Sequence, residues 1–213
     1  MKVALIGASG FVGIPVLNEL LNRGHQVTAI ARNPDKITIK NENLTLKAAD
    51  IFDTENLAKL IEGNDVVISA YNPGWTNPEI YNDFIKGSES IQEASKKAGL
   101  KRLLVVGGAG SLMINGAQLV DSPQFPAEYK AGATAARDFL NTLYHENDLD
   151  WTFLSPAIYL LPGERTGKFR LGTDEPVFDT AGKCEISVED MAVAIVDEIE
   201  NNHFIKKRFT LGY

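Results

Sequence analysis

Three glycines near the start of the chain are spaced to form a tight turn with an open backbone. Gly7, Gly10 and Gly13 follow an apolar stretch (residues 2–6) and open a stretch with helical spacing (residues 11–23). Gly7 permits a sharp turn, Gly10 lets a pyrophosphate approach, and Gly13 lets the helix lie close to a sheet. Free N–H groups at the start of that helix favour an anion. Because strand and helix flank the glycines, the pattern predicts a dinucleotide site.

The residue after the second predicted strand bears on which dinucleotide is bound. Arg32 directly follows the strand at residues 26–31. A guanidinium suits a ribose 2′-phosphate, whereas an NAD-preferring site carries Asp or Glu at this position. The sequence therefore favours NADP(H). The alternative is NAD(H), with Arg32 either a solvated loop cation or stacked on adenine.

Several further residues follow predicted strand ends, where a cofactor would pass. Asp50 either accepts a hydrogen bond from the adenine amino group or caps the turn that follows it. Small residues at positions 69 and 70 leave room for the ribose and nicotinamide. The expected cofactor contacts are Gly7, Ala8, Ser9, Gly10, Phe11, Val12, Gly13, Arg32, Asp50, Ile51, Ser69, Ala70, Tyr71, Gly107 and Gly108.

Strand and helix patterns alternate along the chain. Apolar strands are predicted at residues 2–6, 26–31, 44–48, 65–70, 102–108, 151–155 and 208–212. Helices are predicted at residues 11–23, 54–62, 78–98, 131–147 and 189–200. This alternation predicts an α/β fold with a doubly wound parallel sheet, the Rossmann fold, flanked by helices. Its ligand crevice should lie between the first and fourth strands.

Length and composition fit one domain over residues 1–213, with a small C-terminal extension on the substrate side. Two segments, residues 108–130 and 156–185, carry glycines and prolines without a regular period. We expect the first to be a long loop, and both to contact the substrate.

Charge, hydropathy and cysteine content limit the kinds of partner and the compartment that we expect for the protein. The balance of 21 Lys and Arg against 28 Asp and Glu gives a net charge of −7, which disfavours nucleic acid. No apolar stretch is long enough to span a membrane, and the first ten residues resemble a strand and turn rather than a signal peptide. The lone Cys184 suits a reducing cytoplasm. We expect a cytoplasmic monomer or homodimer that acts on a small molecule.

The remaining charged residues have ordinary structural explanations. His25, His145 and His203 lack metal-ligand spacing, so no metal is expected. Glu189 and Asp190 are expected to complement the dipole of the last helix. The basic run at residues 206–208 is expected to be a solvated turn.

Taken together, the sequence resembles the atypical short-chain dehydrogenase/reductase superfamily. Within it, the resemblance is to the NAD(P)H-binding group provisionally named NADH-flavin reductases, related to biliverdin reductase B-type and NmrA-like proteins. The segments that carry it are GASGFVG (7–13), TAIARNPDKI (28–37), AAD (48–50), VISAYNPG (67–74), VVGGAGSL (105–112), DWTFLSPA (150–157), ISVEDMAVAIVDEIE (186–200) and RFTLGY (208–213). The resemblance implies that Ser111 lies near the nicotinamide.

One departure from the superfamily concerns proton transfer. Many members pair a tyrosine with a lysine four residues later, and the lysine lowers the tyrosine pKa. Here Tyr129 is followed by Lys130 at the next position and by Ala133 at the fourth. Because adjacent helical positions point about 100° apart, Lys130 is a poor substitute. This departure disfavours sugar epimerase and ordinary carbonyl reductase activity.

Flavin reduction tolerates that loss, because a proton can come from water. The favoured hypothesis is an NAD(P)H-dependent reductase with flavin, or a similar quinonoid, as substrate rather than bound cofactor. Ser111 and Tyr129 are the expected catalytic residues. Aromatic side chains that could wall the pocket are Tyr71, Trp75, Phe125, Tyr129 and Tyr159. The alternatives are an NmrA-like redox sensor without turnover and, less favoured, an epimerase or dehydratase.

Overall fold

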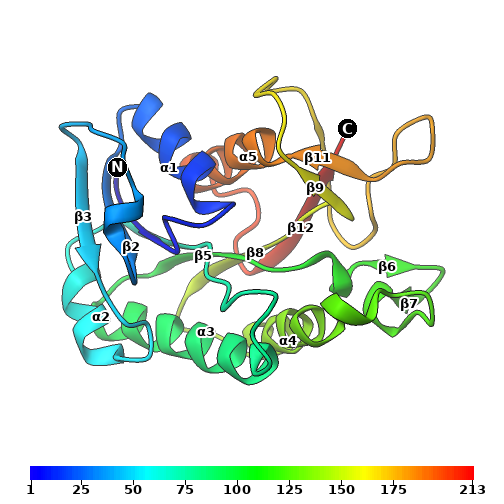
Figure 1. Ribbon diagram of the computed structural model, residues 1–213, viewed down its shortest axis with the longest axis horizontal. Helices are drawn as coiled ribbons and strands as arrows, with labels where there is room; N and C mark the ends of the chain where they lie inside the picture. Colours follow the sequence, from blue (N-terminus) through cyan, green and yellow to red (C-terminus); the bar gives the residue numbers. More distant parts are fainter.

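In the computed structural model, which describes residues 1–213, an eight-stranded sheet lies between two layers of helices (Figure 1). The strand order is β10-β12-β8-β5-β4-β1-β2-β3, and every neighbouring pair is parallel except β10 with β12. The strands are β1 (Lys2–Ile6), β2 (Gln26–Ala31), β3 (Leu44–Ala48), β4 (Val66–Ser69), β5 (Arg102–Val106), β8 (Asp150–Ser155), β10 (Arg170–Gly172) and β12 (Lys207–Gly212). The predicted doubly wound Rossmann sheet is confirmed, and the short antiparallel edge strand β10 is an addition to it.

The helices cover the two faces of the sheet unequally. On one face lie α1 (Gly13–Asn22) and α5 (Val188–Asn201). On the other lie α2 (Thr54–Ile61), α3 (Ile80–Lys97) and α4 (Ala127–Leu143). Successive residues of β1 pack into opposite cores, with Val3 and Leu5 on the α1 side and Ala4 and Ile6 on the α3 side. Burial on both faces explains why these strands are almost wholly apolar in sequence.

Helix α4 lies about one turn earlier in the chain than the sequence pattern predicted. It begins at Ala127 rather than near residue 131, and it ends at Leu143 rather than near residue 147. Pro126 stands directly before it, where its missing N–H costs nothing, and Glu128 in the first turn complements the dipole. As a result Tyr129 belongs to a helix and not to the preceding loop.

The segment at residues 108–130 is more ordered than the long loop that the sequence predicted. It contains a small hairpin of β6 (Met113–Ile114) and β7 (Ala117–Gln118). Asn115 and Gly116 at its tip have φ values of 52° and 79°, as expected for a type I′ turn. A second small sheet pairs β9 (Tyr159–Leu161) with β11 (Glu185–Ser187) inside the segment 156–185.

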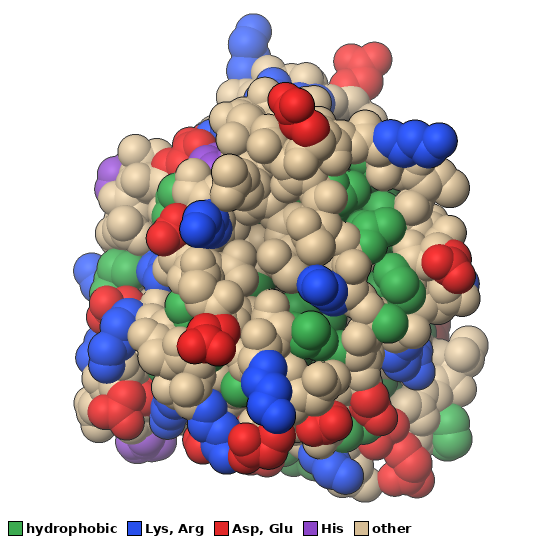
Figure 2. All heavy atoms as spheres, turned by 90° about the vertical axis from the view of Figure 1, so that its left-hand side faces the viewer, with side chains coloured by type: hydrophobic (Ala, Val, Ile, Leu, Met, Phe, Trp, Pro, Cys, Tyr) green, Lys and Arg blue, Asp and Glu red, His purple; other side chains and the backbone are tan.

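The sheet edge at β3 is open to solvent. Four of the five residues of this strand are exposed, and Lys, Arg, Asp and Glu side chains are intermingled on the face shown in Figure 2.

No helix of the structure has both the length and the apolar character needed to cross a membrane. The expected cytoplasmic location, the oligomeric state and the exclusion of nucleic acid stay predictions.

The turn between β1 and α1 packs backbone directly against backbone. A Cβ atom at Gly13 would lie 2.1 Å from the carbonyl oxygen of Gly7. A Cβ atom at Gly7, whose φ is +78°, would lie 2.5 Å from the carbonyl oxygen of Ala70. Only glycine fits at either position, and this is the close packing that the sequence predicts for Gly13.

We expect Gly13→Ala to lower the free energy of unfolding by roughly 1–3 kcal/mol, because the added methyl group must push the helix away from the turn. Urea unfolding followed by circular dichroism measures the change. Gly10→Ala is the matched control, because its Cβ atom would lie 3.2 Å from its nearest neighbour, the Gly7 oxygen. Equal losses in the two variants would contradict this explanation.

A buried carboxylate ties α3 to the connection that follows α4. Glu146 is 7% exposed; its side chain forms an ion pair with Lys96 at 2.5 Å and accepts hydrogen bonds from Gln92 and from the Asp148 N–H group. Burial alone would raise the pKa of Glu146. The Lys96 and Asp148 contacts outweigh burial and lower this pKa to about 2.

This lowered pKa predicts a stability that depends on pH. Glu146 favours the folded state above its unfolded pKa, near 4.5, and that contribution is lost as pH falls toward 2. We expect Glu146→Gln to be less stable than wild type at about pH 6, with the difference narrowing at about pH 3. Urea unfolding at both pH values measures it. A constant difference would mean that Glu146 acts through packing and not through its charge.

Candidate functional site

The predicted cofactor contacts follow the carboxyl ends of the five strands β1 to β5. At the end of β1, the N–H group of Gly7 donates to the Ile30 carbonyl of β2 at 3.0 Å, and Gly7 lies against Ala70 after β4. The turn therefore lies at the point where the sheet order reverses, which is the usual ligand position in such sheets. In Figure 1 it lies near the centre of the view, above the segment that links β4 to α3.

The start of α1 offers unused hydrogen-bond donors. The N–H groups of Ser9, Phe11 and Val12 have no acceptor in the protein. No side chain caps this helix, and its first turn carries no acidic residue. In contrast, Asp53 caps α2 and Ser187 caps α5. An anion at the glycine turn would therefore meet open N–H groups and the positive end of a helix dipole.

Arg32 and Asp50 lie at the ends of the neighbouring strands β2 and β3. Arg32 is exposed and forms no ion pair within the protein. One oxygen of Asp50 accepts a hydrogen bond from the Phe52 N–H group at 3.0 Å, so the capping role considered for Asp50 is present. Its other oxygen is free to accept a further bond. Both charged groups are close enough to influence the pKa of Tyr71.

Tyr71 packs on α3. Its ring stacks on Phe84 with centroids 6.2 Å apart, and its hydroxyl group donates to the Asp83 carbonyl at 3.1 Å. Burial and the nearby carboxylates of Asp83 and Asp50 raise the pKa of Tyr71 to about 12, against an opposing effect of Arg32. A tyrosine with such a pKa keeps its proton at neutral pH. Tyr71 is therefore suited to forming a wall and unsuited to acting as a base.

The end of β5 brings Gly107 and Ser111 into the core. The Phe153 ring fills the space that a side chain at Gly107 would need, because a Cβ atom there would lie 1.8 Å from it. Ser111 is 1% exposed, and its hydroxyl group lies 3.1 Å from that of Ser155 and 3.4 Å from the Gly108 carbonyl oxygen. The catalytic role expected of Ser111 stays a prediction.

Arg208 corrects one expectation from the sequence. The basic run at residues 206–208 was expected to be solvated, but Arg208 is 7% exposed in β12. Its guanidinium group donates to the Ser111 carbonyl oxygen at 2.6 Å and to the Ser111 hydroxyl at 3.3 Å, and it forms an ion pair with Asp174. Lys206 and Lys207 are exposed, and Arg208 is buried because β12 pairs with β8 at this position. Arg208 thus holds Ser111 in place.

The exposed segment at residues 163–167 is fastened by two buried carboxylates. Asp190, expected only to complement a helix dipole, accepts bonds from Thr166 and Gly167 at 2.5–2.8 Å and from the Tyr213 hydroxyl at 2.9 Å. Glu19 of α1 accepts two bonds from Arg165, at 2.6 Å and 2.8 Å. Nothing in the local sequence indicates these long-range contacts. They hold the segment at residues 163–167 against α1 and α5.

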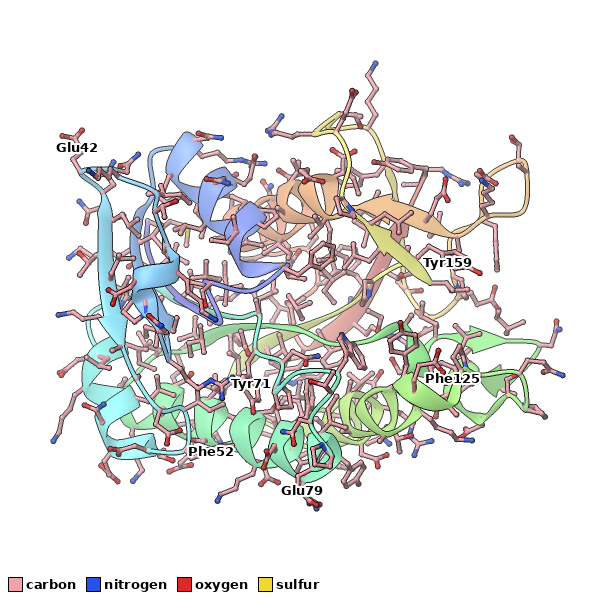
Figure 3. The ribbon with its side chains drawn as sticks, in the orientation of Figure 1. Glu42, Phe52, Tyr71, Glu79, Phe125 and Tyr159 are labelled. Atoms are coloured by element: carbon pink, nitrogen blue, oxygen red, sulfur yellow. The ribbon has the colours of Figure 1, made fainter.

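The five aromatic residues expected near the pocket do not form one cluster. Trp75 and Tyr129 meet edge to face, with ring centroids 5.1 Å apart. Phe125 and Tyr159 lie toward the right-hand side of Figure 3, away from Tyr71. The structure therefore brings together Trp75 and Tyr129 and leaves the other three apart.

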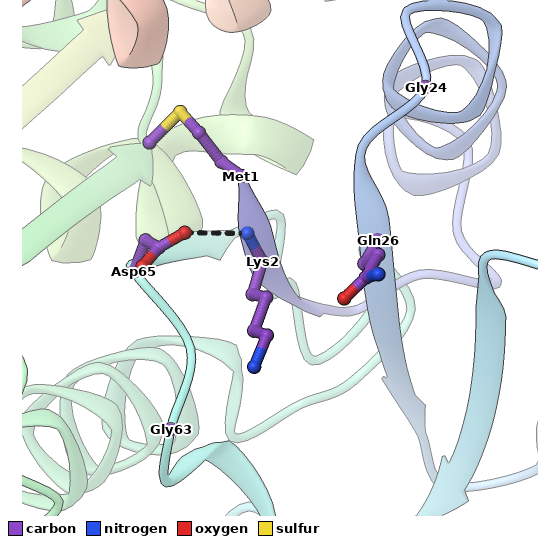
Figure 4. Close-up of a pocket in the computed structure, with 6 residues that line it drawn as sticks. All are labelled: Met1, Lys2, Gly24, Gln26, Gly63 and Asp65. Atoms are coloured by element: carbon purple, nitrogen blue, oxygen red, sulfur yellow. Dashed lines mark hydrogen bonds between the residues drawn. The ribbon is translucent and has the colours of Figure 1, made fainter.

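A separate hollow of about 360 Å³ lies at the opposite end of the strands (Figure 4). Lys2, Gln26 and Asp65, at or beside the starts of three strands, line it, and the Lys2 N–H group donates to Asp65 at 2.7 Å. None of the predicted site residues lines this hollow. It is remote from the glycine turn and has no part in the candidate site.

Comparison with known proteins agrees with this geometry. The chain matches the NAD(P)H-binding family model over residues 7–202. It is 36% identical to the uncharacterized protein YwnB of Bacillus subtilis, over 99% of this chain and 98% of that protein. It also matches cinnamoyl-CoA reductase 2 of Arabidopsis thaliana at 30% identity, over 53% of this chain and 37% of that protein.

Two solved structures are similar over the full length of the chain. A provisionally named epimerase from Bacteroides thetaiotaomicron is 48% identical with a TM-score of 0.94, and covers 100% of this chain and 96% of that one. A provisionally named NADH-flavin reductase from Streptococcus pneumoniae is 36% identical with a TM-score of 0.85, over 100% and 99%. With the open glycine turn at the reversal of the sheet, these matches show that the chain belongs to the NAD(P)H-binding family, in an atypical group of the short-chain dehydrogenase/reductase type.

Proposed function

We propose that the protein is an NADPH-dependent reductase whose hydride acceptor is a flavin or a similar quinonoid compound. The observation that carries the proposal is a dinucleotide turn combined with a missing proton relay. Tyr129 lies in the first turn of α4, and the residue one helical turn later on the same face is Ala133 rather than lysine. Carbonyl chemistry needs an acid at this place, whereas a quinonoid acceptor does not.

The preference for NADPH is supported by the surroundings of Arg32. Its guanidinium group is exposed at the end of β2, has no ion-pair partner, and follows a strand that ends without Asp or Glu. A planar cation with several donors suits a phosphate group on the ribose. An acidic residue there would repel that phosphate.

Around the glycine turn, N–H groups and side chains of this chain would bind and orient the dinucleotide. The free N–H groups of Ser9, Phe11 and Val12 would bind the pyrophosphate, and Asp50 has one carboxylate oxygen left for the adenine amino group. Ala70 lies directly against Gly7, and its small side chain would take up little of the space that the ribose needs. Together these contacts would set the direction in which the dinucleotide lies.

We assign Ser111 and Tyr129 to the nicotinamide end. Arg208 can only donate, so the Ser111 oxygen accepts from it, and the serine hydrogen is left for the Gly108 carbonyl oxygen or the Ser155 hydroxyl group. In the assigned role Ser111 would turn this hydrogen toward the polar edge of the nicotinamide ring, and the exposed Tyr129 would be available to the acceptor. When bound, NADPH supplies a hydride from nicotinamide C4 to flavin N5, and the proton that flavin N1 takes up comes from water. The protein's part is to hold two flat rings at reacting distance.

Two alternatives use the same cofactor site. A redox sensor of the NmrA-like kind would bind the dinucleotide without turnover, and the missing lysine is equally consistent with it. An epimerase is supported by the provisional name of the Bacteroides relative. It would have to work with Tyr129 or Ser111 alone, because Ala133 stands at the lysine position.

Steady-state oxidation of NADPH tests the proposal, with FMN, FAD, riboflavin and quinones offered in turn as acceptors. We expect turnover with at least one of them. Coenzyme binding by calorimetry without any turnover would favour the sensor and overturn the reductase. Failure to bind either the oxidised or the reduced coenzyme would remove all three functions.

Arg32→Asp tests the choice of coenzyme. We expect the Kd for NADPH to rise roughly 10- to 100-fold, because a charged hydrogen bond is replaced by repulsion, with little effect on NADH. Lys36→Asp is the matched control, since it makes the same charge change on an exposed residue of the same connection. Calorimetric titration of each variant measures both constants. Unchanged NADPH affinity in Arg32→Asp would show that the 2′-phosphate is not recognised there.

A further inference from the structure

Helix α4 carries an edge-on tyrosine–tryptophan pair at each end. At its start, the rings of Trp75 and Tyr129 have centroids 5.1 Å apart and planes at 86°. Just after its end, Tyr144 meets Trp151 at 5.7 Å and 75°. The geometry is alike, but Trp151 is 1% exposed, whereas Trp75 and Tyr129 are 52% and 45% exposed. In the second pair only Tyr144, which is 52% exposed, reaches solvent, whereas both rings of the first pair do.

The exposed pair of Trp75 and Tyr129 is held by packing against α4. A Cβ atom at Gly132, in the interior of α4, would lie 2.8 Å from the Trp75 ring and 2.8 Å from Ile80. Glycine lowers helix stability relative to alanine, so its presence here needs a reason. That reason is the indole ring, which lies directly on the helix backbone.

A second helix repeats the arrangement. Gly87 in α3 has the ring of Tyr71 and the side chain of Ile51 within 2.5 Å of the place where its Cβ atom would be. Tyr71 and Trp75 both belong to the segment that joins β4 to α3. Two helix glycines thus accommodate two rings of one connecting segment.

This segment is the one that touches the glycine turn. Ala70 at its start lies against Gly7, and Trp75 further along meets Tyr129, the residue at the nicotinamide end in the proposed function. Within the segment, the Asn72 side chain accepts from the Gly74 N–H group at 2.7 Å, and Asn77 accepts from Glu79 at 2.9 Å. An ordered segment therefore carries the indole from the cofactor side to α4.

We infer that Trp75 and Tyr129 form an aromatic wall that selects a planar, ring-bearing acceptor by stacking against it. The inference rests on the proposed function and adds to it the residues that set specificity. Because the two rings are perpendicular, part of their faces stays uncovered, and a flat π system can stack there. Binding costs little conformational entropy, since both side chains are already held by packing. An aliphatic acceptor gains no such contact.

Flavin emission tests the wall without catalysis, because a flavin stacked on an indole or phenol is quenched. The protein is saturated with NADP⁺ and titrated into riboflavin. We expect wild type to quench the emission, and Trp75→Ala and Tyr129→Ala to raise the Kd for riboflavin about tenfold. Gly132→Ala, which displaces the indole while favouring the helix, should weaken binding in the same direction. Calorimetry should give the same NADP⁺ affinity in all of them.

Two controls separate stacking from other effects. Tyr144→Ala removes an equally exposed ring from the other pair and should leave the riboflavin Kd unchanged. Tyr129→Phe keeps the ring and should keep riboflavin affinity, which a hydrogen-bonding role of the hydroxyl group would not allow. Riboflavin affinity that is equal in wild type, Trp75→Ala and Gly132→Ala overturns the wall.

Kinetics distinguish failure of the wall from failure of the proposed function. If wild type reduces flavin and Trp75→Ala does so with an unchanged KM for flavin, the wall is wrong and the reductase stands. If wild type binds and quenches riboflavin through Trp75 but turns over no acceptor, the wall stands and the reductase is wrong. If Trp75→Ala has a raised KM for flavin and an unchanged KM for NADPH, the result supports both the wall and the reductase.

Discussion

The site depends on how closely the backbone at the end of β1 approaches the backbone at the end of β4. At Gly7 there is no room for a side chain, because the Ala70 carbonyl occupies that space, and Gly13 is pressed onto the same turn from the helix side. The N–H group of Gly7 is held at the same time by Ile30 of β2. Three strand ends and one helix start are thereby fixed relative to each other, and the open N–H groups face the point where they meet.

Much of the architecture could be predicted from residue patterns, because burial on both faces makes a strand wholly apolar. Residues 3–6 and 103–106 are of this kind, and both stretches lie in central strands. Residues 108–130 were harder, since no period runs through them. Even so, the dipeptide Asn115–Gly116 favours a two-residue hairpin turn, and it stands where β6 and β7 meet.

Some residues of the candidate site could likewise be predicted from the sequence, and others could not. The glycine turn and Arg32 follow from spacing along the chain, because each is set by its own strand. The role of Arg208 could not be predicted in this way, because Lys206 and Lys207 before it are exposed and only the pairing of β12 with β8 turns it inward. The meeting of Trp75 with Tyr129, and of Asp190 with Thr166, joins segments distant in sequence. Such contacts depend on the packing of the whole sheet, which no local pattern records.

Helix α1 links the glycine turn to the exposed segment at residues 163–167. The first turn of α1 faces the predicted pyrophosphate position, and Glu19, about two turns further along, holds Arg165 of the C-terminal segment. A helix moves as a stiff rod, so a tilt imposed at one end reappears at the other. A shift of the first turn on phosphate binding would in this way be carried to Arg165 and to the exposed segment at residues 163–167.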